Sequence, residues 1–137
     1  MNRMIYQVAV GSQSKLYLHC IESVKKYCEK YNITHIVQNE PILKIRPDET
    51  RTGRSKEAVN RLGYLPIYEK ENAFTHLNNY DQIAIIDSDI YIKIDAPNIF
   101  DTLTEEYAFG AVAERELPCA KKYKSKIRKY SKAADPP

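Results

Sequence analysis

A short apolar run followed by two acids constrains this chain more than any other feature. Residues 83–86 read Ile-Ala-Ile-Ile, and Asp87-Ser88-Asp89 follows them directly. A continuous β-branched run of this length is typical of a strand buried on both faces of a parallel sheet. Ligands of open α/β sheets bind at the carboxyl ends of such strands, where these acids would lie. The stretch therefore predicts an α/β fold with a site that begins at residue 87.

The two carboxylates suit a divalent cation, because Mg²⁺ and Mn²⁺ prefer oxygen ligands. Asp87 and Asp89 would repel each other and lose hydration behind an apolar strand, and a bound cation relieves both costs. The competing interpretation is an Asx-type turn at the strand end with both acids in water. The apolar residues on either side favour the metal-binding interpretation.

The N-terminal residues predict the opening of a parallel sheet. Residues 4–10 are mostly apolar and predict a first strand. Apolar residues recur near the 3.6-residue period over 15–31, which predicts a helix capped by Ser12 or Ser14. Residues 33–37 predict a second strand. A strand-helix-strand opening favours parallel strands joined by a right-handed crossover.

Further elements are predicted from short apolar runs and helical periods. They are an extra strand at 41–45, a helix at 56–79 that breaks between Gly63 and Pro66, an extended segment at 90–94, a helical turn at 99–101, a strand at 107–112 and a helix at 119–132. Arg51 and Arg54 lie in a polar run and are candidates for phosphate contacts, because guanidinium groups match phosphate geometry. A solvated loop is the competing interpretation there.

Size and cysteine content limit the class of protein. The 137 residues predict one domain or part of one. The sequence contains no stretch of about 18 apolar residues, so no membrane-spanning helix is predicted. The N-terminus becomes polar too soon for a signal peptide. The three cysteines lack a Cys-x-x-Cys spacing. They therefore predict free thiols in a reducing, cytoplasmic protein.

Charge is divided unevenly along the chain. Residues 121–132 carry seven basic side chains and no acid, and subtracting these from the net charge of +3 leaves −4 for the rest. We therefore predict a domain at 1–118 and a basic helix or tail at 119–137. Such a basic amphipathic segment fits peripheral contact with an anionic membrane or an acidic glycan. Nucleic-acid binding and a plain solvated tail are the alternatives.

The run YDQIAIIDSDIYI, residues 80–92, resembles the Asp-x-Asp segment of GT-A fold glycosyltransferases. The most similar group is the glycogenin-like family 8 enzymes, which share the strand, the acids and the following apolar residues. The resemblance implies a Rossmann-like, mostly parallel sheet flanked by helices. It also implies a metal-dependent transferase that uses Mn²⁺ or Mg²⁺. Such an enzyme moves a sugar from a nucleotide-diphosphate donor, with UDP favoured, to a glycan, lipid or protein acceptor.

The resemblance also implies roles for single residues at the acids. Asp89 is the direct metal ligand, Asp87 divides its role between the metal and the donor ribose, and Ser88 is the small spacer. Related enzymes often place a basic residue on the preceding helix, and Lys70 stands ten residues before Tyr80. The resemblance therefore implies that Lys70 approaches the donor phosphates or the two acids. The competing interpretation is that Lys70 pairs only with the acids of its own charged run.

The turn after the first strand shapes the base pocket in these enzymes. By resemblance, Ala9, Val10 and Gly11 lie against the base or ribose of the donor. Family 8 members often carry an acid just after this strand, whereas Gly11 and Ser12 stand here. A plain turn glycine is the competing interpretation of Gly11.

Two departures from the family pattern leave alternatives open. GT-A catalytic domains usually extend well beyond this length, and no histidine follows Asp89 to complete the metal site as in family 8 enzymes. We therefore expect either the N-terminal part of a catalytic domain or a shortened, non-catalytic nucleotide-sugar- or metal-binding module. A haloacid-dehalogenase-type phosphatase is a further alternative, although Tyr91 stands where that class usually has Thr or Val. No catalytic base is assigned, and Glu114 and Glu116 are the candidates.

Overall fold

The computed structural model describes residues 1–11, 14–46, 57, 60, 63–102 and 108–111. Met1–Thr102 form one compact unit, and Leu103–Pro137 form a second. Several predicted features lie outside the described residues. They are Arg51, Arg54, Glu114, Glu116, the third cysteine Cys119, the boundary between 118 and 119, and the basic helix at 119–132.

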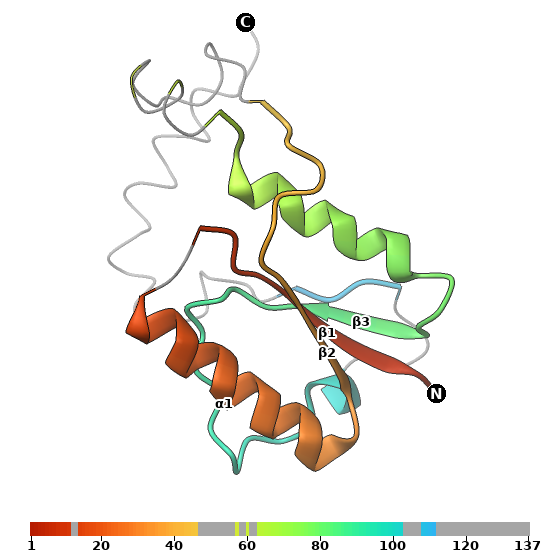
Figure 1. Cartoon of the computed structure of the whole chain (residues 1–137). Helices are drawn as coiled ribbons and strands as arrows, with labels where there is room; N and C mark the ends of the chain where they lie inside the picture. The colour runs from red at the N-terminus through yellow and green to blue at the C-terminus, as the bar shows by residue number, and fades with distance from the viewer. Residues whose placement is uncertain (12–13, 47–56, 58–59, 61–62, 103–107, 112–137) are drawn as a thin grey trace, which may run out of the picture. The chain divides into compact units, whose positions relative to one another are not determined.

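A three-stranded parallel sheet forms the centre of the first unit (Figure 1). Strand β1 (Arg3–Val8) lies between β2 (Thr34–Gln38) and β3 (Gln82–Ile85). The prediction that the apolar run before Asp87 is buried on both faces is wrong, because β3 lies at the edge of the sheet, is only half-buried and leaves Ile85 40% exposed. Met4 pairs in register with Thr34 on one side and with Ile83 on the other. The prediction of an α/β fold with a parallel sheet is confirmed, and the carboxyl ends of all three strands meet at one edge.

Helices cover both faces of this sheet (Figure 1). Ile5 packs against Val24 of α1 (Lys15–Tyr31) on one face. Tyr6 belongs to a second core cluster with η1 (Pro66–His76) on the opposite face. Because alternate side chains of a strand point to opposite faces, the continuous burial of β1 follows from having a helix on each side.

Helix α1 occupies the residues that the periodicity predicts, Lys15–Tyr31. Ser14 caps its N-terminus, because the hydroxyl accepts an N–H of the first turn. Asn32 ends the helix with a left-handed backbone, φ 53°. Cys20 and Cys28 are buried free thiols, as predicted. Burial in this helix interface raises the pKa of the Cys28 thiol to about 11.

The helix predicted at 56–79 is formed in part. Glu57 and Asn60 are helical, and the predicted break occurs at 63–65. The second part, η1, is a 3₁₀ helix rather than an α-helix. Side chains three residues apart are eclipsed in a 3₁₀ helix. This period places the polar residues Glu69 and Asn72 together on the buried face.

Two predicted strands are wrong. Residues 41–45 form no strand but an irregular loop with bends at 42–43. Lys44 takes a left-handed backbone with φ 51°, and the preceding N–H groups bond to a carboxylate instead of a neighbouring strand. The described part of the strand predicted at 107–112, residues 108–111, is irregular. Phe109 is 80% exposed there, and Gly110 disfavours a strand.

The chain after the two acids has no regular structure at 90–93, so the extended segment predicted at 90–94 is not a strand. A turn at 94–95 leads to η2 (Ile99–Thr102), a 3₁₀ turn where a helical turn was predicted. Among the described helices, none is long and apolar enough to cross a membrane.

Candidate functional site

The two acids lie in a tight turn at the carboxyl edge of the sheet. Strand β3 ends two residues before Asp87, and the N–H of Ile90 donates to the Asp87 carbonyl at 3.1 Å. We call Asp87–Ile90 the acidic turn. The carboxylates of Asp87 and Asp89 are exposed, whereas Ser88 between them is buried. Both acids are therefore available to a ligand from one short segment.

A buried amide on the neighbouring strand fixes this turn. Gln7 of β1 is fully buried, and its Nε2 donates to the Asp87 carbonyl at 3.2 Å. Its Oε1 then accepts from Nε2 of His35 on β2 at 2.8 Å, which places the imidazole proton on Nε2. Burial, followed by the positive charge of Lys25, lowers the pKa of His35 and keeps the ring neutral. Gln7 was not among the predicted site residues, although a glutamine within an apolar strand is an available signal.

Lys70 meets the acidic turn from the other side. Its Nζ forms an ion pair and a hydrogen bond with Oδ1 of Asp87. The two side chains are 32% and 53% exposed. An ion pair this exposed contributes at most about 1 kcal/mol to stability, because water and salt screen it. Its significance is that it places a positive charge directly on one of the two acids.

Glu69 anchors the helical turn that carries Lys70. Its side chain is fully buried, and its carboxylate accepts the backbone N–H groups of three consecutive residues at 2.7 to 3.0 Å. They are Ile42, Leu43 and Lys44. The Gln38 side chain donates a fourth hydrogen bond at 2.7 Å. Glu69 thereby ties η1 to the loop that leaves the carboxyl end of β2.

The surroundings of Glu69 keep it charged. Burial by itself raises the pKa of a carboxyl group, but the three backbone N–H bonds and the Gln38 amide outweigh burial and lower the pKa of Glu69. Tyr6 and Asn72 extend the network, since Tyr6 donates to Gln38 and accepts from Asn72 at 2.9 Å. All buried side-chain polar atoms among the described residues have a partner. The charged carboxylate of Glu69 is therefore held by neutral hydrogen-bond donors alone within the described part of the chain.

Helix α1 holds the segment that follows the acidic turn. The Tyr27 hydroxyl donates to the Pro97 carbonyl at 2.8 Å and accepts from the Ile99 N–H at 2.7 Å. Three further α1 side chains bond to the same segment. The Ser23 hydroxyl accepts the Ile92 N–H at 3.0 Å, the Lys30 ammonium donates to the Ile94 carbonyl at 2.9 Å, and the Tyr31 hydroxyl donates to the Ala96 carbonyl at 2.8 Å. Polar side chains of α1 thus fix a segment that lacks regular structure.

The residues predicted to contact the donor base lie at the same sheet edge as the acidic turn. Ala9 and Val10 are buried just past the end of β1, and the Ala9 N–H donates to the Gln38 carbonyl at 2.8 Å. Gly11 takes φ 72°, and a Cβ built on it would meet nothing within 4 Å. A turn requirement therefore explains Gly11 without a ligand. Its role at a nucleotide remains a prediction.

The acidic turn fits a hard cation in chemistry but supplies few ligands. Asp87 and Asp89 offer carboxylate oxygens, which Mg²⁺ and Mn²⁺ prefer. Within the part of the chain that the structure describes, no three His, Cys, Asp or Glu side chains converge. Mg²⁺ in phosphate-handling sites is commonly held by one or two carboxylates, with substrate phosphates as further ligands. The turn therefore suits a cation shared with a phosphorylated ligand.

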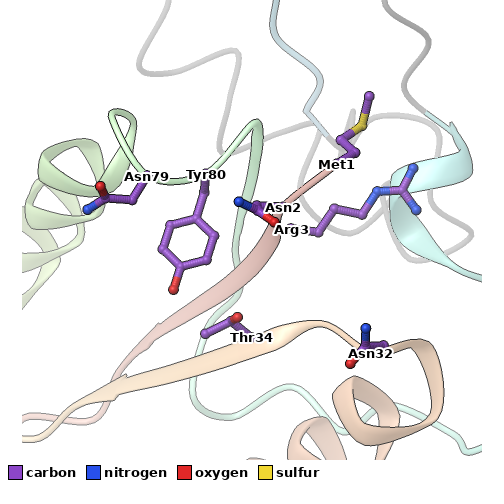
Figure 2. A pocket seen from close by; sticks show the side chains of 7 residues that line it. All are labelled: Met1, Asn2, Arg3, Asn32, Thr34, Asn79 and Tyr80. Atoms are coloured by element: carbon purple, nitrogen blue, oxygen red, sulfur yellow. The ribbon is translucent and has the colours of Figure 1, made fainter.

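An open hollow of about 390 Å³ lies at the opposite, amino edge of the sheet (Figure 2). It is lined by Met1, Asn2, Arg3, Asn32, Thr34, Asn79 and Tyr80. The Arg3 side chain points away toward η2, where it pairs with Asp101 at 3.7 Å. The residues that line this hollow include no Asp or Glu, whereas Asp87 and Asp89 lie at the carboxyl edge, so we place the candidate site there.

The comparisons with known proteins add no relative. No family model, curated protein or solved structure matches this chain.

Proposed function

We propose that this chain binds a nucleotide-diphosphate sugar through a divalent cation and belongs to a metal-dependent glycosyltransferase of the GT-A kind. The observation that carries the proposal is the acidic turn. Asp87 and Asp89 follow the edge strand β3 at the carboxyl edge of a parallel sheet, and Lys70 pairs with Asp87. That edge is where open α/β sheets bind nucleotides. Two carboxylates and a lysine together match a cation bound to a diphosphate.

Each residue at this edge has a role in the proposal. Asp89 and Asp87 hold Mn²⁺ or Mg²⁺, Ser88 is the small, buried spacer between them, and Lys70 contacts a donor phosphate. The chemistry that the bound cation supplies is Lewis-acid stabilisation of the charge on the departing nucleoside diphosphate. Ala9–Gly11 lie at the same sheet edge and border the base or ribose.

Calorimetric titration of UDP and of GDP, each with and without Mn²⁺, tests this function. We expect Mn²⁺-dependent binding of one nucleotide. Removing residues that merely orient a metal ligand costs about 10- to 100-fold in affinity, so Asp89→Ala, which removes a direct ligand, should weaken binding about 100-fold. Asp95→Ala is the matched control, because Asp95 is an exposed carboxylate six residues further along the chain. Absence of nucleotide binding by the folded wild type, or equal losses in both variants, would contradict the proposal.

A non-catalytic nucleotide-sugar-binding module is the second candidate. It is favoured by the absence of a third metal-ligating side chain near the acidic turn among the described residues. Release of UDP from a UDP-sugar in the presence of Mn²⁺ separates the two functions. Measurable hydrolysis that Asp89→Ala abolishes supports the enzyme, whereas tight donor binding without turnover supports the module.

A further inference from the structure

We propose, on the basis of the function above, that Lys70 acts as the counter-cation of Asp87 in the ligand-free protein. As a result, a divalent ion binds well at the acidic turn only when a diphosphate binds with it. The ammonium group is bonded to Oδ1 of Asp87, across 17 residues of sequence and from a different element. A positive charge therefore already stands on one of the two carboxylates that would hold the cation. Lys70 and the divalent ion compete for the same oxygen.

This competition weakens binding of a divalent ion that arrives alone. The ion must either displace Lys70 from Asp87 or bind beside it, and two cations a few ångströms apart repel each other. With Asp87 engaged, Asp89 is left as the second carboxylate of the acidic turn. A single exposed carboxylate holds a divalent ion poorly. The ligand-free protein is therefore expected to bind Mn²⁺ weakly.

A diphosphate removes the conflict. Its oxygens offer Lys70 a second negative partner, and lysine contacts phosphate as a flexible point charge with three donors. When Lys70 shifts from Asp87 to a phosphate oxygen, Oδ1 becomes free for the cation. The same phosphates supply the cation with the ligands that the turn lacks. Nucleotide and metal then strengthen each other's binding by the same factor, as linkage requires.

The structure provides the mechanical conditions for this shift. The backbone beneath Lys70 is fixed, because the adjacent Glu69 is fully buried and bonded to three backbone N–H groups of 42–44. The Lys70 side chain is 32% exposed. A fixed base with a partly exposed, four-carbon side chain lets the ammonium move between neighbouring oxygens without rearranging the helix.

Two affinities measured on the full chain test the proposal. The signal of free Mn²⁺ in electron paramagnetic resonance gives the affinity for Mn²⁺ alone, and calorimetry at saturating Mn²⁺ gives the affinity for UDP. We expect Lys70→Met to tighten Mn²⁺ alone by roughly five- to tenfold, since it removes a competing charge. The same variant should weaken UDP by about tenfold or more, since it removes a charge-assisted bond.

Two further variants serve as controls. Lys93→Met removes an equal charge from an exposed lysine nearby in the sequence and should leave both affinities unchanged. Lys70→Arg keeps the charge and should stay within about threefold of wild type for Mn²⁺ alone. Circular dichroism establishes that each variant is folded.

The outcomes separate this proposal from the function on which it rests. If wild type binds UDP with Mn²⁺ but Lys70→Met binds Mn²⁺ alone no more tightly, Lys70 is not a counter-cation and the proposal is overturned. Equal effects of Lys70→Met and Lys93→Met would overturn it as well. If folded wild type binds no UDP with Mn²⁺, the proposed function itself fails.

Discussion

Glu69 is fully buried, yet it remains charged because backbone N–H groups of 42–44 converge on its carboxylate. In the sequence, Glu69-Lys70-Glu71 is indistinguishable from a solvated charged run. Burial of the first residue depends on the 3₁₀ period of η1 and on a loop 25 to 27 residues away. Neither is encoded in local pattern, so this anchor could not be predicted from the sequence.

Replacing this carboxylate with an amide should destabilise the protein at neutral pH. Glu69→Gln presents an NH₂ group and a single acceptor to four donors, and we expect a loss of about 2 to 4 kcal/mol in the free energy of unfolding. Urea denaturation measures it. Because the pKa of Glu69 is lowered on folding, its contribution is present above the unfolded value of about 4.3 and disappears as pH falls through the lower folded value. The difference between wild type and variant should therefore shrink in acid.

Glu71→Gln provides the comparison, because Glu71 is exposed on the same helix. It should change the free energy of unfolding by no more than about 0.5 kcal/mol. An equal loss in both variants, or a loss in Glu69→Gln that is independent of pH, would show that the backbone N–H groups do not depend on a charged Glu69.

At the scale of elements, local periodicity correctly predicted the elements that are formed by interactions between residues close in sequence. Helix α1 and its Ser14 cap match the prediction, because apolar spacing and capping act within a few residues. The extra strand at 41–45 was wrong because a strand needs a partner, and the N–H groups there bond to a side chain instead. The hydroxyls of Tyr27 and Tyr31 on α1 also bond to residues 96–99, which helical periodicity does not predict.

The Tyr27 hydroxyl should therefore matter for the stability of the segment that follows the acidic turn. Tyr27→Phe leaves the Pro97 carbonyl and the Ile99 N–H without their partner, and we expect a loss of about 1 to 3 kcal/mol in the free energy of unfolding. Burial raises the pKa of Tyr27, so the hydroxyl remains protonated and able to donate at neutral pH. Chemical denaturation gives the loss.

Tyr17→Phe tests whether the effect is specific to that hydroxyl. Tyr17 lies on the same helix and is only partly buried. We expect a change within about 0.5 kcal/mol. If the two substitutions cost the same, the hydrogen bonds of Tyr27 to residues 97 and 99 contribute nothing beyond general helix packing.

At the scale of the whole molecule, the sequence predicted the sheet and the edge at which the acids lie. Two local patterns were sufficient for that, the apolar run before Asp87 and the strand-helix-strand opening. Each of them is typical of strands in a parallel sheet. The supports of the site were not predictable in the same way. Gln7 bonds to Asp87 across 80 residues of sequence, and Lys70 reaches it from η1. Such contacts appear only after the sheet has aligned three distant segments.

Because these segments come from β1, β3 and η1, a ligand at the acidic turn should stabilise the first unit as a whole. A ligand that binds the folded state alone adds about 2.7 kcal/mol at 100 times its dissociation constant. For a unit near 100 residues, this amounts to an increase of about 10 °C or more in the melting temperature. We expect this increase with UDP and Mn²⁺ together, measured by differential scanning calorimetry. We expect a smaller increase with UDP in a chelator.

Asp89→Ala should keep its own melting temperature with both ligands present, whereas Asp95→Ala should respond like wild type. An equal increase in Asp89→Ala would place the ligand away from the acidic turn, and no increase under conditions that saturate the site would contradict selective binding to the folded state.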